Sequence, residues 1–208
     1  GQLYSTRSGN IDLEAETSVN YTIGAARSFG DVLKLELAPF HHDISDRISR
    51  DAPGPLGVFL NYAKVKMTGV EFTAELTPVE DLFFKFGYTY NRARDKSSGR
   101  GTDKVTKAPE HMGNARFRYI LPQVRTRLDL NVIHVSRSYS QVPTPQNPND
   151  PVLVADGYTL FGGKISQEFL KHFEVYLAVN NLFDKNYEPE SGYPAPGRSF
   201  WLGVDFKY

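Results

Sequence analysis

Three adjacent side chains could bind a metal ion. His41, His42 and Asp43 form the one cluster of metal-capable residues in the sequence, with Asp46 just beyond it. Imidazole nitrogens and carboxylate oxygens are ordinary ligands of transition metals. Adjacent residues of a strand point to opposite faces, however, so the two histidines cannot easily share one ion if this segment is extended. Two interpretations stay open: a site for a metal or metal chelate, and a polar stretch at the rim of a larger structure.

A second set of residues could bind anions, because arginines recur at every other position in three segments. Such spacing places guanidinium groups on one face of a strand, as a basic stripe in the interior or at the outer rim of a barrel. An anionic ligand would suit it. Carboxylates nearby would explain the arginines equally well as paired structural charges. The arginines are Arg92, Arg94, Arg116, Arg118, Arg125 and Arg127, of which the first four are our candidate ligand-binding residues. The carboxylates are Glu71, Glu75 and Asp129.

Catalytic motifs do not occur in the sequence. There is no nucleophile elbow, no glycine loop that would cradle a phosphate, and no zinc-protease motif. His134 and Ser136 would share a strand face at a spacing of two, which is little ground for a hydrolase. We therefore expect neither an enzyme nor a bound cofactor.

Composition narrows the classes of protein further. The 208 residues include 24 basic and 24 acidic side chains, so no global positive field attracts nucleic acid. No cysteine is present, which excludes disulfides and thiolate metal sites. No apolar run is long enough for a transmembrane helix. Aromatic residues reach 13%, which is high for an ordinary soluble domain.

The elements that must position these residues are strands. Apolar and polar side chains alternate with a period of two through most of the chain, and helical periodicity is nearly absent. About nine segments have this pattern, most of them close to the length of a tilted barrel strand. They are 19–25, 33–37, 70–76, 82–90, 115–119, 128–132, 158–165, 173–179 and 200–208.

The connections between these segments alternate strictly between short and long. Outer-membrane β-barrels have this arrangement, with tight periplasmic turns and long external loops. The short connections are 28–31, 77–81, 121–124 and 170–172, and the long ones are 45–60, 95–108, 140–156 and 184–197. We therefore predict an all-β, antiparallel transmembrane β-barrel in the outer membrane of a Gram-negative bacterium.

The last strand has the clearest two-sided pattern. One face is apolar and suits outer-membrane lipid, the other carries Trp201, Gly203, Asp205 and Lys207, and the strand ends on an aromatic residue. We expect this strand to be the element through which the barrel-assembly machinery recognises the chain. Its apolar face consists of Phe200, Leu202, Val204, Phe206 and Tyr208.

Motifs near the C-terminus resemble a known family. Asn180-Asn-Leu-Phe-Asp-Lys-Asn-Tyr187, followed by Pro194-Ala-Pro-Gly-Arg-Ser-Phe200, is similar to the end of TonB-dependent outer-membrane receptors. Gly9-Asn-Ile-Asp-Leu-Glu-Ala-Glu16 and Lys107-Ala-Pro-Glu-His111 resemble two earlier segments of that family, although the first lacks the usual proline before its last glutamate. The asparagines and aspartate of the C-terminal motif are better explained by turn structure than by ligand binding.

The resemblance implies that residues 1–208 are the C-terminal segment of a barrel of roughly 22 strands. It also implies a plug domain and a TonB-contacting segment that this segment does not include. The whole receptor would import a scarce nutrient such as a ferric siderophore, haem, cobalamin or a metal. An odd number of strands, with the first residues on the outside, agrees with a segment that begins partway round a larger barrel.

Two other architectures remain as alternatives. A stand-alone small barrel, acting as a pore, adhesin or membrane anchor, would have an even number of strands. A soluble β-sandwich with a binding function would bury one face of each sheet against the other. The uninterrupted apolar face of residues 82–90 speaks against the sandwich.

Overall fold

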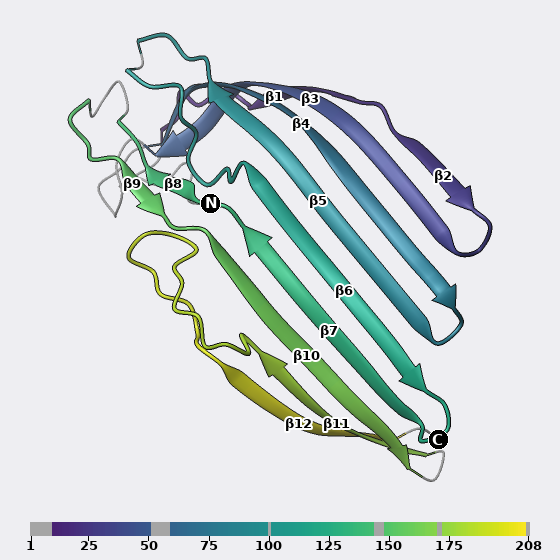
Figure 1. Ribbon diagram of the computed structural model, residues 1–208. Coiled ribbons are helices and arrows are strands. Elements are labelled where there is room, and N and C mark those ends of the chain that lie inside the picture. The colour runs from purple at the N-terminus through teal and green to yellow at the C-terminus, as the bar shows by residue number, and fades with distance from the viewer. Residues whose placement is uncertain (1–9, 51–58, 100, 144–147, 170–171, 207–208) are drawn as a thin grey trace.

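A computed structural model describes residues 10–50, 59–99, 101–143, 148–169 and 172–206 of this chain. In these ranges the protein is all-β, and ten strands form one curved antiparallel sheet (Figure 1). Two further strands form a separate small hairpin. Within the described ranges, no helix is long and apolar enough to cross a membrane.

The strands follow one another around the sheet. Their bounds are β1 (Thr17–Thr22), β2 (Ala25–Phe29), β3 (Leu33–Arg50), β4 (Phe59–Val79), β5 (Leu82–Asp95), β6 (His111–Leu121), β7 (Thr126–Val135), β8 (Ser138–Gln141), β9 (Leu153–Ala155), β10 (Tyr158–Phe169), β11 (Phe173–Asn180) and β12 (Ser199–Phe206). The order in the main sheet is β1-β3-β4-β5-β6-β7-β10-β11-β12, with β2 also paired to β3.

β1 and β2 lie end to end along one neighbour. β1 pairs with β3 from Phe40 to Ser45, and β2 pairs with the same strand from Leu33 to Leu37. The two short strands therefore occupy one position in the sheet. Counted over the described residues, the main sheet thus has nine positions, which agrees with the number of strands expected from the alternating pattern.

The two ends of the sheet differ in their connections. The turns at one end are short, whereas the long connections gather at the other end (Figure 1). β1 begins at the end with the long loops, since Thr17 pairs with Ser45, and β12 runs toward the end with the short turns. Asn10 Nδ2 donates to the Phe59 carbonyl oxygen at 3.2 Å, so Asn10 also lies at the long-loop end.

One of the predicted long loops is partly wrong. Of the segment 45–60, both ends belong to strands, because β3 continues to Arg50 and β4 begins at Phe59, and 51–58 lies outside the described residues. Backbone pairing between these two strands continues through a β-bulge near Arg47, where Asp46 has a φ of 56°. Apolar and polar side chains do not alternate regularly in this extension, so a prediction based on alternation missed it. A strand that projects beyond the membrane need not keep one face apolar.

The connection 140–156 has a structure of its own. β8 and β9 pair antiparallel within the segment between β7 and β10. The expectation of a long polar connection is correct in its position, but this connection is partly a hairpin.

The register of the main sheet confirms the predicted apolar face. Leu37 pairs with Phe72, and Phe72 pairs with Tyr88, so these side chains lie on one side across three strands. We call this side the apolar face and the opposite side, which includes Lys85 and Asp129, the polar face. No second sheet packs on either face within the described residues, which excludes a β-sandwich for this part of the chain.

The buried core is correspondingly small. In the described part of the chain the buried hydrophobic residues are Val65, Val105, Val142 and Ala155. Large apolar side chains are instead exposed along the apolar face, as lipid contact requires. In β12 they are Phe200, Leu202, Val204 and Phe206, and Leu202 is 78% exposed. Tyr208, the last residue of that predicted face, lies outside the described residues.

Candidate functional site

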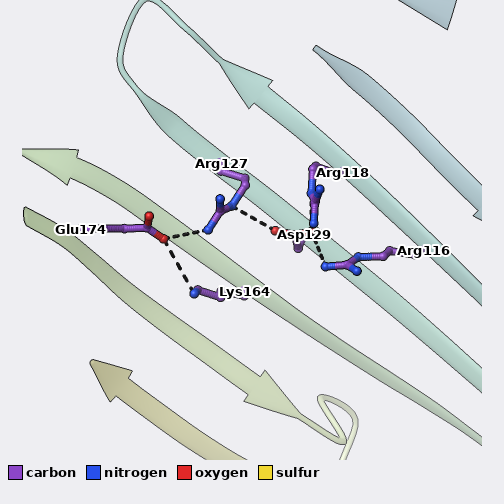
Figure 2. A network of polar contacts seen from close by, with 6 residues as sticks. All are labelled: Arg116, Arg118, Arg127, Asp129, Lys164 and Glu174. Atoms are coloured by element: carbon purple, nitrogen blue, oxygen red, sulfur yellow. Dashed lines mark hydrogen bonds and ion pairs between the residues drawn. The ribbon is translucent and has the colours of Figure 1, made fainter. Parts of the chain in front are cut away.

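Three arginines converge on one carboxylate on the polar face. Arg116 Nη2 and Arg118 Nε lie 3.0 and 2.9 Å from Asp129 Oδ1. Arg127 Nε lies 3.3 Å from the other oxygen, Oδ2 (Figure 2). A single carboxylate therefore stands against three guanidinium groups.

A second carboxylate extends this network to the next two strands. Arg127 Nη2 lies 2.7 Å from Glu174 Oε1, and Lys164 Nζ lies 3.8 Å from the same oxygen (Figure 2). The network thus crosses β6, β7, β10 and β11. Four cations face two carboxylates, so the network carries an excess of two positive charges.

Burial differs between the two signs of charge. The side chains of Asp129 and Glu174 are only 14% and 10% exposed, whereas that of Arg116 is 52% exposed. The carboxylates are therefore covered by the cations that they hold. What the network presents to the space above the polar face is mainly guanidinium and ammonium, which suits an anionic partner.

Strand register explains why these residues meet. Arg118 pairs directly with Asp129, and Asp129 pairs with Lys164 on its other side. Directly opposed side chains in an antiparallel pair lie within reach of one another, and long side chains also reach neighbours two positions away on the same face. Arg116 lies diagonally across from Asp129 on β6, and Arg127 lies two residues before it on β7 itself.

In the other half of the polar face, the two lysines of β3 and β5 each have a carboxylate partner. Lys85 Nζ bonds to Glu75 Oε1 at 2.7 Å, and Lys34 Nζ bonds to Glu36 Oε1 at 2.6 Å. Each cation there has its own carboxylate. The two cations in excess therefore belong to the network of Asp129, and Glu168, which is opposite Glu174 on β10, is a further carboxylate beside it.

A hollow lies beside the network at the end with the short turns. Its volume is about 580 Å³, and Arg125 in the turn between β6 and β7 contributes to its wall. The other lining residues are Ile120, Pro122, Thr126, Arg127, Ser166, Glu168 and Glu174. The network and this hollow together form the candidate site for an anionic ligand or segment.

The predicted basic stripe is wrong for two of its members. In β5, Arg92 and Arg94 have the same parity as Tyr88 and Tyr90, so they lie on the side of the apolar face. Arg116 pairs with Lys85 and lies on the opposite side. The spacing of two within each pair suggested one stripe for the four arginines, but the sheet separates them into two groups.

The predicted metal cluster is divided in the same way. His41 and Asp43 lie on the side of Arg92, and His42 lies on the polar face, where its ring centroid is 4.9 Å from that of Phe40. Both nitrogens of His41 are engaged, one with Thr68 Oγ1 at 2.8 Å and one with Asp43 Oδ2 at 3.3 Å. No group of three metal-capable side chains occurs among the residues that the structure describes.

The pair considered for hydrolysis does not form either. His134 Nδ1 bonds to Thr159 Oγ1 at 2.9 Å, and Ser136 Oγ accepts a hydrogen bond from the His111 amide at 3.0 Å. The two side chains bond to different partners. A serine activated by that histidine is absent from this arrangement.

The motif that begins at Asn180 is a structural turn. Asn181 is buried, and its side chain both donates to the Lys185 carbonyl at 2.9 Å and accepts from the Lys185 amide at 2.8 Å. Asp184 Oδ1 accepts from the Arg198 amide at 2.7 Å, so it ties the start of the loop to its end. Both Asn181 and Asp184 have positive φ, which these residue types tolerate. The structural interpretation of this motif is confirmed.

The long loops are tied to one another, which alternation could not predict. Thr106 bridges Tyr139 of β8, and the Lys107 amide donates to the Tyr139 carbonyl at 2.8 Å. Lys107 Nζ also lies 2.8 Å from Glu190 Oε2 in the loop before β12. Three loops far apart in sequence therefore form one connected layer at this end of the sheet.

One loop packs onto the polar face itself. Val105 is 6% exposed and packs against Val65, which is fully buried. The surrounding side chains are Ile44, Met67, Ala93 and Ala108. The loop between β5 and β6 thus covers the polar face of β3–β5 at the long-loop end.

Comparison with protein families gives a match over most of the chain. Residues 1–182 match the family model described as TonB dependent receptor-like, beta-barrel. An iron-regulated outer membrane virulence protein of Vibrio cholerae is 29% identical over 215 residues, covering 96% of this chain and 32% of the relative. A vitamin B12 transporter, BtuB, of Photobacterium profundum is 26% identical and covers 99% and 32%, respectively. The chain thus spans about a third of the length of these relatives.

Solved structures share the fold. The siderophore receptor PirA from Acinetobacter baumannii superimposes with a TM-score of 0.76 at 20% identity, over 96% of this chain and 33% of that one. The pyoverdine receptor FpvA from Pseudomonas aeruginosa has a TM-score of 0.75 at 20% identity, over 100% of this chain and 32% of that one. At this identity the likeness concerns the fold alone.

Proposed function

Because this chain belongs to the TonB-dependent receptor β-barrel family, we propose that it is part of a receptor that imports an iron chelate across the outer membrane. The chain is a segment of an antiparallel outer-membrane β-barrel of a Gram-negative bacterium. Its polar face is the lumen face, since the opposite side carries the apolar residues that lipid requires. Cargo would therefore pass along the polar face.

The excess of positive charge in the network of Asp129 carries this proposal. Arg116 and Arg118 share one carboxylate, so neither is neutralised fully, and both remain partly exposed to the lumen. Exposed guanidinium groups attract chelates of net negative charge and hold their carboxylate or phenolate oxygens by charge-assisted hydrogen bonds. An iron-regulated relative agrees with this choice of cargo.

Cobalamin is the second candidate cargo. The relative in Photobacterium profundum is named as a vitamin B12 transporter, and it matches the chain over almost its whole length. Haem and metal ions remain further members of the same group of scarce nutrients. The local charge excess favours an anionic chelate among them.

The partners follow from the mode of transport. We expect a plug domain to fill the lumen against the polar face, and TonB to supply the energy for release of the cargo inward. Assembly would start from β12, whose exposed apolar face of Phe200, Leu202, Val204 and Phe206 is the signal for the barrel-assembly machinery. Lipid of the outer membrane covers that face in the finished barrel.

Uptake by the full-length receptor tests this function. A strain without endogenous receptors would express the receptor, with and without TonB, and accumulation of radioactive ferric chelates and cobalamin would be measured. We expect TonB-dependent accumulation of an anionic ferric chelate. Arg116→Gln combined with Arg118→Gln should raise its half-saturating concentration about tenfold, because exposed charge contacts contribute up to about 1 kcal/mol each.

The matched control removes two cations of the same face that each have their own carboxylate partner. Lys34→Gln combined with Lys85→Gln leaves the network of Asp129 intact and should change the half-saturating concentration less than about twofold. Uptake without TonB would support a passive pore instead and would contradict the proposal. Uptake of cobalamin alone would show that the iron chelate is the wrong cargo.

A further inference from the structure

The outward side of β5 changes from apolar to basic between Tyr90 and Arg92. Its outward-facing residues are apolar or aromatic through Tyr90, and the next two are Arg92 and Arg94. The stretch from Leu82 to Tyr90 is as long as the roughly 9–11 residues that a tilted strand needs to cross a bilayer. Arg92 therefore lies just beyond the hydrocarbon layer, on the side that faces the surrounding membrane.

The same change occurs in two neighbouring strands at the same level. Pro39, Val70 and Tyr90 form one row across β3, β4 and β5. The two rows beyond it are polar. The first contains His41, Thr68 and Arg92, and the second contains Asp43, Lys66 and Arg94. Because β3, β4 and β5 all change from apolar to polar side chains at this level, the boundary between the two regions runs across the surface of the sheet.

This surface is hollowed. A depression of about 570 Å³ lies across β4 and β5 and reaches from the last apolar row to the cations beyond it. Val70 and Tyr90 line its membrane side. The polar side is lined by His41, Lys66, Thr68, Arg92, Arg94, Lys96 and Asp103.

Positive charge exceeds negative charge around the depression. Lys66 Nζ lies 3.2 Å from Asp43 Oδ1, and Arg94 Nε lies 3.3 Å from Asp103 Oδ2. Among the described residues, the side chains of Arg92 and Lys96 have no ion-pair partner. Two cations are therefore available to a ligand.

The nearby carboxylates reduce this excess but do not cancel it. Glu110 Oε1 accepts a hydrogen bond from the Tyr90 hydroxyl at 3.3 Å, so the four cations of the depression face three carboxylates, Asp43, Asp103 and Glu110. Asp43 lies beyond the apolar band, and its interaction with the Lys66 ammonium lowers the pKa of its carboxyl from the ordinary value. His41 holds Asp43 from the other side at 3.3 Å. Asp43 is thus already engaged by two partners and does not compete for Arg92.

A ligand for this depression must be amphiphilic and anionic. Its apolar part would lie against Val70 and Tyr90 at the level of the membrane, and its anionic part would meet Arg92 and Lys96. We propose that this surface binds the phosphate-bearing headgroup of a lipid in the outer leaflet of the membrane. Arginine and lysine at the boundary of a membrane protein bind lipid phosphates in this way, and an aromatic ring anchors the interface. The site lies on the side away from the lumen, so it is separate from the proposed path of the cargo.

Native mass spectrometry of the full-length receptor tests the proposal. The receptor would be delipidated in detergent and titrated with a diphosphorylated glycolipid, with a zwitterionic phospholipid as comparison. We expect Arg92→Gln combined with Lys96→Gln to weaken glycolipid binding about tenfold or more, since both cations that would contact the lipid phosphates are removed. Arg92→Lys combined with Lys96→Arg should retain most of the binding, because the charges remain.

Lys34→Gln combined with Lys85→Gln removes two cations from the lumen face and serves as the matched control. It should leave glycolipid binding unchanged. A gel assay of heat-modifiable migration would establish that each variant is folded. Equal binding by Arg92→Gln/Lys96→Gln and the native receptor would overturn the proposal.

Two further outcomes would also overturn it by identifying other ligands. Competition by inorganic phosphate at concentrations similar to those of the glycolipid would mean that the site binds free phosphate and not a lipid. Equal affinity for the zwitterionic phospholipid would contradict selection for negative charge. Cargo uptake should be unchanged in Arg92→Gln/Lys96→Gln, so a failure of this proposal is distinguishable from a failure of the transport function.

Discussion

Phe40 and Gly69 face each other across the β3–β4 pair, and the phenylalanine ring covers the glycine. A Cβ placed on Gly69 would lie 2.5 Å from Cζ of Phe40, and it would also collide with the Tyr90 carbonyl oxygen. Both neighbours are therefore closer than a side chain allows. The absence of a Cβ lets an aromatic ring pack directly on the backbone of the neighbouring strand.

Gly69→Ala should destabilise the barrel by about 1–3 kcal/mol, the usual range for an overpacked site. The Phe40 ring can rotate away, but the Tyr90 carbonyl belongs to the backbone of β5 and cannot move without disturbing the β4–β5 pair. Urea unfolding of the full-length receptor in detergent micelles would measure the change. Gly101→Ala is the control, because a Cβ at Gly101 would meet nothing within 4 Å beyond its chain neighbours. Equal stability of the two variants would contradict the close packing at Gly69.

Asp129→Asn should lower stability by about 1–3 kcal/mol, because hydrogen bonds to charged groups are among the stronger ones and three guanidinium groups lose their shared anion. The four cations of the network would then repel one another with only Glu174 left to hold them. The measurement is urea unfolding at low and high salt.

The stability lost in Asp129→Asn should become smaller as salt is added, since ions screen the remaining repulsion between partly exposed cations. Glu80→Gln in the turn between β4 and β5 is the control, because it removes one carboxylate from an exposed position. If the loss of stability in Asp129→Asn does not depend on salt, packing and not charge is its cause.

Val105→Asp should release the loop between β5 and β6 from the polar face. The side chain is 6% exposed against Val65, and a carboxylate there would lack a compensating partner. Hydrogen exchange of residues 101–110 should become faster, while exchange in β6 and β7 should be unchanged. Val124→Asp introduces the same charge at an exposed turn position. It should leave hydrogen exchange unchanged both in residues 101–110 and in β6 and β7. Unchanged exchange in the loop would contradict the packing of Val105.

Leu130→Arg tests the assignment of the two faces. Leu130 lies in the middle of β7 on the apolar face and is 42% exposed, which in the membrane means contact with lipid. An arginine on the lipid side near the midplane should cost about 2–4 kcal/mol. Folding into lipid vesicles, followed by heat-modifiable migration, would measure it. The control is Leu153→Arg in the hairpin of β8 and β9, which should fold like the native protein. If Leu130→Arg folds as well as Leu153→Arg, the two faces are assigned wrongly.

Much of the fold could be predicted from the sequence. Alternation is a local property, because successive side chains of a strand point to opposite sides regardless of what lies beside the strand. It located all nine positions of the main sheet and the apolar face of β12. It failed at β3 and β4 near Arg47, where apolar and polar side chains no longer alternate with a period of two.

The candidate site could be predicted only in part. Parity along β5 alone would have placed Arg92 with Tyr88 and Tyr90, so the separation from Arg116 was already present in the sequence. The roles of Lys164 and Glu174 were not, because both join the network through pairing with strands that are distant in sequence. No local pattern indicates which strand will lie beside which residue.

The sequence by itself determined the class of fold, the direction of the strands and which residues share a side of each strand. These follow from the two-residue period and from the alternation of short and long connections. The tertiary structure decided which charges meet, as with Arg118 and Asp129, and where a loop such as that of Val105 packs. Register between strands and the packing of loops depend on contacts between distant segments, and a local pattern contains no information about those contacts.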